Sequence, residues 1–147
     1  MEKSYTDQKN RIFDKIEQIE EDISLLKEIA PDTFEEYKSS KVEKPACERQ
    51  IERIMEAVTD IAFYLIKIKK LKRPEDDSSS YFILSDSEII SKSLAENLKS
   101  AKGMKNFITH QYDKIDDEIV FNSIKTQLEK DVREFIVKVR EILNGNN

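Results

Sequence analysis

Apolar residues recur along most of this chain at the alternating three- and four-residue spacing of amphipathic helices. The first run, from about Thr6 to Ile29, carries apolar side chains at Ile12, Ile16, Ile19, Ile23 and Leu26. Successive members are four, three, four and three residues apart, so they form one narrow seam on a helix face. Pro31 ends this helix, and residues 32–37 are expected to form one short helical segment.

A second long helix is predicted to begin near Pro45, because proline suits the first helical turn. Its apolar positions at helical spacing are Ile51, Ile54, Met55, Val58, Ala62 and Leu65. Its C-terminal half, residues 61–68, is apolar nearly all round. This pattern indicates burial on more than one side, and therefore a subunit interface as well as a core.

The second half of the chain predicts two further long helices. One spans about Ser91 to Gln111, with Leu94, Leu98, Ala101 and either Phe107 or Ile108 facing inward. The last begins after an N-cap at Asp116 and has inward positions at Phe121, Ile124, Leu128, Val132, Phe135, Val139 and Ile142. Residues 74–80 are expected to be a loop, and residues 81–84 fit helix or strand equally well.

Four long helices with short connections predict an all-α fold: an antiparallel up-and-down bundle of four long helices plus short helical segments. Residues 1–147 are expected to form a single domain, with 143–147 as a frayed tail. The alternative, a coiled-coil assembly, is disfavoured because the connections are too frequent for one long rod. Gly103 is expected to allow a close approach of two helices.

Composition favours a cytoplasmic protein. Charged residues make up 37% of the chain and hydrophobic ones 38%, with no apolar run long enough to cross a membrane and no apolar signal core at the start. The single cysteine, Cys47, cannot form an internal disulfide, and a packed thiol is expected there rather than a reactive one. One histidine and one cysteine exclude the common zinc sets, so no metal and no cofactor is expected.

The formal net charge of −5 means that contact with RNA requires a local basic patch. The candidates form what we call the basic cluster: Lys67, Lys69, Lys70, Lys72 and Arg73. One interpretation is a solvated helix end whose cations suit the helix dipole. The other is a docking surface for RNA or for a protein partner.

The candidate chemistry lies in residues 105–112, the motif segment. It contains Lys105, Asn106, Tyr112 and the only histidine of the chain, His110. At about 100° per residue, Lys105 and Tyr112 share a helix face, whereas His110 points away from Lys105 unless the helix ends or unwinds nearby. A histidine can transfer protons near neutral pH, and a lysine can hold a phosphate, which together suit RNA cleavage without a metal. Lys105 as an ordinary solvated lysine is the alternative.

The motif segment resembles the signature of HepT-like proteins of the HEPN superfamily, in which an arginine, usually an asparagine, a histidine and a tyrosine occupy the positions of Lys105, Asn106, His110 and Tyr112. Residues 45–62, 88–98 and 113–116 resemble the flanks. The resemblance implies a dimeric helical bundle that acts as the ribonuclease toxin of a prokaryotic toxin–antitoxin pair. It implies an MntA-type nucleotidyltransferase antitoxin as partner and, in some members, adenylylation of the tyrosine.

The same resemblance implies that His110 is catalytic, that Asn106 supports the site and that Lys105 holds the phosphate. Lysine keeps the charge of the family's arginine but loses its bidentate fork, which we expect to weaken transition-state stabilisation by about 2–4 kcal/mol. An alternative function is therefore a noncatalytic subunit that binds a nucleotide or docks a minimal nucleotidyltransferase. A third is a helical dimer with an unrelated interaction role.

Overall fold

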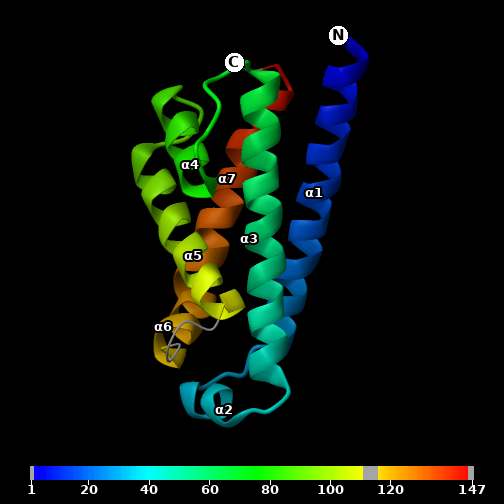
Figure 1. Ribbon diagram of the computed structural model, residues 1–147. Coiled ribbons are helices and arrows are strands. Elements are labelled where there is room, and N and C mark those ends of the chain that lie inside the picture. The colour runs from blue at the N-terminus through cyan, green and yellow to red at the C-terminus, as the bar shows by residue number, and fades with distance from the viewer. Residues whose placement is uncertain (1, 111–115, 146–147) are drawn as a thin grey trace.

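The computed structural model describes residues 2–110 and 116–145, and all regular structure in these ranges is helical. The long segments are α1 (Glu2–Ile29), α3 (Glu43–Ile68), α5 (Lys92–His110) and a last one made of α6 (Asp117–Asn122), the π-helical turn η1 (Ser123–Gln127) and α7 (Leu128–Leu143). Two short helices, α2 (Phe34–Ser39) and α4 (Asp77–Asp86), lie in the connections. Successive long segments run in opposite directions, which confirms the predicted antiparallel bundle (Figure 1).

The core lies where the predicted seams meet. The five apolar residues of the seam on α1 are each exposed by 4% or less, and they pack along α3. On α3, the predicted all-round apolar half is buried at Ile61, Ala62, Leu65 and Ile66. Phe63 of the same half stays only partly buried. Burial of this apolar area is the main favourable contribution to folding.

Helix α4 begins inside the segment that the sequence predicts to be a loop. The Asp76 carboxylate accepts a hydrogen bond of 2.7 Å from the Ser79 backbone N–H, and the Asp76 N–H donates to Ser79 Oγ at 3.1 Å. This capping box satisfies the first free N–H groups and starts the helix at Asp77. Tyr81 is therefore helical, and its buried hydroxyl lies 2.8 Å from Thr59 Oγ1 on α3.

The last helix begins as predicted, because Asp116 Oδ1 accepts hydrogen bonds from the N–H groups of Glu118 and Ile119 at 3.0 and 3.3 Å. It is not continuous, however, since the Leu128 N–H donates to the Ser123 carbonyl five residues earlier. This π-helical turn adds one residue to the winding.

The turn leads into a polar network between α5 and α7. Asp131 is exposed by only 4%, and it accepts hydrogen bonds from Gln127 Nε2 at 3.0 Å and Asn97 Nδ2 at 3.2 Å. These bonds satisfy the buried carboxylate and join the last helix to α5.

Two smaller expectations differ from the structure. A Cβ built on Gly103 meets nothing within 4 Å, so the expected close helix approach does not occur among residues 2–110 and 116–145. Leu143, expected in the frayed tail, is 2% exposed and belongs to the core. None of the described helices combines the length and the apolarity that crossing a bilayer requires.

Candidate active site

Residues 105–110 of the motif segment form the C-terminal end of α5. Ile108 is the inward apolar residue there, with 4% exposure, whereas Phe107 is 50% exposed. His110 is the last residue of the helix and is exposed, and Asn106, four residues earlier, is half-buried. Their spacing puts Asn106 and His110 on one face, as predicted. The Tyr112 prediction lies outside the described residues.

Lys105 is not a solvated surface lysine. Its residue is 8% exposed, and its Nζ lies 3.9 Å from Oε1 of Glu56 on α3. That distance is too long for a good charge-assisted hydrogen bond, so the contact is an ion pair without close bonding. Lys102, one turn earlier, is similarly buried and pairs with Asp77 at 3.0 Å. Each buried cation of α5 therefore faces a carboxylate of a neighbouring helix.

A row of carboxylates on α3 runs beside the motif segment. Glu48, Glu52 and Glu56 are four residues apart and share a helix face. Thr109 Oγ1 donates a hydrogen bond of 2.8 Å to Glu52 Oε2, which fixes the last turn of α5 against α3.

The surroundings of this row also shift the pKa of one of its carboxyl groups. Burial raises the pKa of Glu48, nearby Asp117 and Glu52 raise it further, and Lys44 opposes the shift. The sequence contains the four-residue spacing of the row, but only the packing of α3 against α5 shows that the row faces the motif.

Within one chain, Lys105 and His110 do not converge. The helix is regular up to His110, and five residues of α-helix separate the two side-chain directions by about 140°. The unwinding that would bring them together is not present in this part of α5. Lys105 faces α3, while His110 lies at the helix end that carries the negative pole of the helix dipole.

The basic cluster lies at the other end of α3 from the motif segment. Lys67, Lys70 and Arg73 surround a hollow of about 530 Å³, which we call the basic hollow. Its other lining residues are Phe63, Ile66, Leu71 and Pro74. Lys67 is about 16 Å along the α3 axis from Glu56, the partner of Lys105. The structure therefore does not bring the RNA-binding candidates to the candidate catalytic residues.

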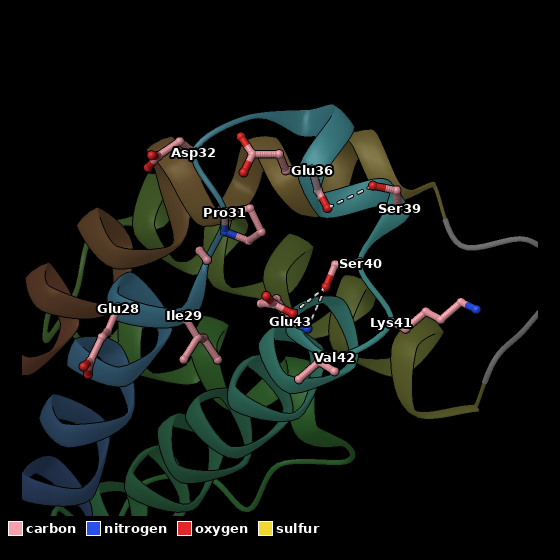
Figure 2. Close-up of a pocket in the computed structure, with 11 residues that line it drawn as sticks. Glu28, Ile29, Pro31, Asp32, Glu36, Ser39, Ser40, Lys41, Val42 and Glu43 are labelled. Atoms are coloured by element: carbon pink, nitrogen blue, oxygen red, sulfur yellow. Dashed lines mark hydrogen bonds between the residues drawn. The ribbon is translucent and has the colours of Figure 1, made fainter.

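A second hollow, of about 570 Å³, lies where α1, α2 and α3 meet, and we call it the acidic hollow (Figure 2). Four carboxylates, Glu28, Asp32, Glu36 and Glu43, line it together with one cation, Lys41, so its lining is acidic on balance. Its hydroxyls serve local helix ends: Ser40 Oγ donates to Glu43 Oε2 at 2.7 Å, and Ser39 Oγ donates to the Glu35 carbonyl at 2.9 Å. This lining repels phosphate, so the larger hollow is not the site for RNA.

Cys47 is fully buried, as expected for a packed thiol. Burial raises the pKa of its thiol to about 11, with Lys125 opposing and Glu43 and Glu48 adding to the shift. A thiol of this kind is protonated at neutral pH and is a poor nucleophile. Among the described residues, Lys105, Asn106 and His110 of the motif segment therefore remain the candidate catalytic residues.

Comparison with known proteins agrees with the resemblance seen in the motif. The family described as Ribonuclease HepT-like matches residues 19–139. The chain belongs to the HepT-like ribonuclease family. A relative from Archaeoglobus fulgidus, described as a putative RNase, is 34% identical over 89 residues, which cover 60% of this chain and 66% of the relative.

Relatives from Shewanella oneidensis extend this likeness to most of the chain. The mRNA nuclease HepT of that organism is 26% identical over 125 residues, which cover 85% of this chain and 92% of the relative. A solved HEPN toxin from the same organism, tri-AMPylated and in complex with an MNT antitoxin, has a TM-score of 0.84 at 25% identity. The superposition covers 88% of this chain and 96% of the solved toxin, so the two bundles match over most of their length.

Proposed function

We propose that this HepT-like protein is the toxin of a prokaryotic toxin–antitoxin pair and a metal-independent endoribonuclease of the cytoplasm. The observation that carries the proposal is the arrangement at the end of α5. A buried cation, Lys105, lies within one and a half turns of the chain's only histidine, His110, in a chain whose family is HepT-like. The named nucleases among its relatives support the same function.

The chemistry follows from the side chains. His110 accepts the proton of an RNA 2′-hydroxyl, and the 2′-oxygen attacks the adjacent phosphorus. The bond from phosphorus to the 5′-oxygen breaks, and that oxygen leaves with a proton delivered by an imidazolium. The products are a 2′,3′-cyclic phosphate and a 5′-hydroxyl. Lys105 stabilises the negative charge that builds up on the phosphoryl oxygens, and Asn106 orients His110 from one turn below.

The divergence of Lys105 and His110 supports a homodimeric site. If the ends of two α5 helices face one cleft, the cation of one copy and the imidazole of the other can approach the same phosphate. The exposed side of α5 suits such contact, because Phe107 is 50% exposed and the space beside Gly103 is open. A dimer cleft would give Gly103 the close-packing role that it lacks within one chain.

The antitoxin in this proposal is an MntA-type nucleotidyltransferase that silences the toxin by adenylylating Tyr112. The solved HEPN toxin, AMPylated and bound to its MNT antitoxin, supports this partner. Coexpression with a neighbouring nucleotidyltransferase gene should add one or more AMP units to the wild type and none at this site in Tyr112→Phe, as read by mass spectrometry of the peptide.

A noncatalytic binding subunit is the second candidate, and one contact favours it. The Glu56 carboxylate lies 3.9 Å from Lys105 Nζ and offsets the charge that a phosphate would need. Lys105→Arg separates the two candidates. A large gain in RNA cleavage means a nuclease weakened by its lysine, and no gain favours the binding subunit.

The decisive experiment compares induced expression of the wild type, His110→Ala and a control, Lys92→Ala, each without other genes of the locus. We expect growth arrest and RNA decay with the wild type and with Lys92→Ala only. The purified wild type should yield 2′,3′-cyclic phosphate ends in the presence of a chelator. RNA cleavage that survives His110→Ala would contradict the proposed mechanism, and soluble, folded wild type without any effect would favour the binding subunit.

A further inference from the structure

The basic hollow at the C-terminal end of α3 is lined by cations and by one aromatic residue, Phe63. Phe63, Ile66 and Lys67 lie on one face of α3 because they are three and four residues apart. Arg73 and Pro74 come from the segment that returns over this face. The lining of the hollow contains three cations and no carboxylate.

The shape of the hollow depends on an unusual helix end. The Leu71 N–H donates to the Ile66 carbonyl at 2.9 Å, and the Lys70 N–H donates to the Lys67 carbonyl at 3.1 Å. These two bonds form the Schellman motif, whose left-handed position is most often glycine. Here it is Lys70, with φ of 55°. A lysine therefore occupies a backbone conformation that favours glycine, and this lysine lines the hollow.

Phe63 is directed to the hollow rather than to the core. It is half-buried, yet it lies outside the core cluster and outside the half-buried apolar residues that pack against that cluster. Tyr64, its neighbour, does pack against the core. Phe63 also lines the hollow, so its ring can contact a planar group that enters there.

The cations of the hollow are not paired with carboxylates of the described residues. Among residues 5–110 and 116–145, Lys67, Lys70 and Arg73 have no ion-pair partner. Of the three carboxylates that follow Pro74, Asp76 caps α4 and Asp77 pairs with Lys102. The third, Glu75, is exposed and is not part of the lining. A locally positive hollow thus persists on a chain of net charge −5.

We propose that the basic hollow holds one nucleotide of a single-stranded RNA substrate, with its base on Phe63 and its flanking phosphates on Lys67, Lys70 and Arg73. The proposal rests on the proposed ribonuclease function and adds a substrate subsite to it. Stacking on an aromatic ring beside cations is how proteins hold unpaired bases, whereas a duplex hides its base faces. The distance of about 16 Å to Glu56 makes this a binding site remote from the reacting phosphate.

The ring is tested by fluorescence anisotropy with labelled single-stranded oligouridine, in a His110→Ala background that leaves the RNA intact. Phe63→Leu removes the ring and keeps an apolar side chain, and we expect roughly 5- to 150-fold weaker binding. Phe63→Tyr keeps the ring and should bind as the parent does. An oligomer without bases should not distinguish the three proteins. Equal affinity of the Leu and Tyr variants for oligouridine would overturn the stacking.

The cations are tested by the dependence of affinity on salt. Lys67→Ala, Lys70→Ala and Arg73→Ala should each reduce the slope of log affinity against log salt by about 0.7, the value for one phosphate contact on a single strand. Lys130→Ala, an exposed lysine on α7, is the matched control and should leave the slope unchanged. Lys70→Gly should lose the same affinity while its melting temperature stays equal or rises, because glycine suits the left-handed position.

The outcomes separate this inference from the function on which it rests. If the wild type cleaves RNA and the hollow variants bind it as tightly as their parent, the inference is wrong and the function stands. A protein partner in the hollow would give that result, together with loss of its complex in Phe63→Leu. If the wild type neither binds nor cleaves RNA, both proposals fail together. Circular dichroism of each variant excludes unfolding as the cause.

Discussion

The two ends of α3 carry hollows of similar size and opposite lining. The acidic hollow at the N-terminal end has a volume of about 570 Å³ and is lined by four carboxylates and one lysine. The basic hollow at the C-terminal end has about 530 Å³ and three cations without a carboxylate. The net charge of −5 does not show that one end of α3 is locally acidic and the other locally basic. RNA binding must therefore be judged from the local distribution of charge, not from the total.

The cation of the motif segment and those of the basic hollow differ in burial and in pairing. Lys105 is 8% exposed and faces one carboxylate, so its position is fixed by packing. Lys67 and Lys70 line the basic hollow and are exposed. A fixed cation suits stabilisation of a transition state, which needs set geometry, while exposed cations suit capture of a long anion. Three predictions test this comparison, two through RNA cleavage or binding and one through the stability of the acidic end of α3.

The largest expected effect comes from Lys105→Met, which keeps the buried volume and removes the charge. We expect RNA cleavage to fall by about 10²–10³-fold and RNA affinity to change by less than about twofold, because the lost charge acts in the transition state. The free energy of unfolding should change by less than about 1 kcal/mol, because the remaining Glu56 side chain is 52% exposed and stays hydrated. Single-turnover cleavage and urea unfolding measure the two.

The matched control for this variant is Lys102→Met. Lys102 is equally buried, one turn earlier on α5, and its partner Asp77 also has a half-exposed side chain. It should keep cleavage. An equal loss of activity in both variants would mean that any buried cation of α5 supports the fold of the site, and that Lys105 has no special role.

A smaller effect is expected when the acidic hollow is given the charge of the basic one. Glu28→Lys/Asp32→Lys places two cations at the N-terminal end of α3, where both native residues are exposed. Affinity for single-stranded RNA should rise by roughly tenfold at low salt and fall back at high salt, because counterion release is its only source. Oligomers with and without bases should gain equally, since no ring lines this hollow.

The control is Glu134→Lys, an exposed residue of α7 outside both hollows. A gain that depends on the bases would show that charge alone reproduces the selectivity assigned to Phe63. That result would remove the distinction between the two hollows.

The smallest effect concerns Glu48. Burial raises its pKa in the folded protein, so the folded state favours the protonated carboxyl. This contribution is present below the ordinary glutamate range, about pH 4, and is lost as the pH rises through the raised pKa. Glu48→Gln mimics the protonated form at every pH. We expect it to exceed the wild type in stability by up to about 1 kcal/mol near pH 7 and to match it near pH 4.

Denaturant unfolding at the two pH values measures this difference. A wild type that is the more stable protein at neutral pH would mean that ionised Glu48 has a favourable role, for instance with Lys44. The acidic end of α3 would then be stabilised by its charge rather than strained by it.

The sequence predicted the bundle because buried helix faces leave a direct record in residue spacing. The seam on α1 and the N-cap at Asp116 were both confirmed. The prediction of a loop over residues 74–80 was wrong in its second half. A serine-rich stretch is typical of a loop, and the capping bond between Asp76 and Ser79 that starts α4 was not predicted. The π-helical turn has no residue signature of its own, so residue spacing did not predict it.

The candidate site was less accessible to sequence reasoning. The residues of the motif segment were found, and Lys105 turned out to be buried, which spacing alone does not show. The carboxylate row of α3 was missed because its relation to the motif is tertiary. The basic cluster was proposed for RNA, but its distance from His110 and the ring of Phe63 beside it depend on the course of the chain after α3.

The π-helical turn at residues 123–127 also bears on how the length of this chain can change. In a regular α-helix, loss of one residue turns everything beyond it by about 100° and would move the apolar face of α7 into solvent. Within the π turn, loss of one residue restores ordinary α-helical winding and leaves the flanking faces in register. The last helix thus contains one place where a deletion is tolerated, and homologues that differ by a residue here can share one core.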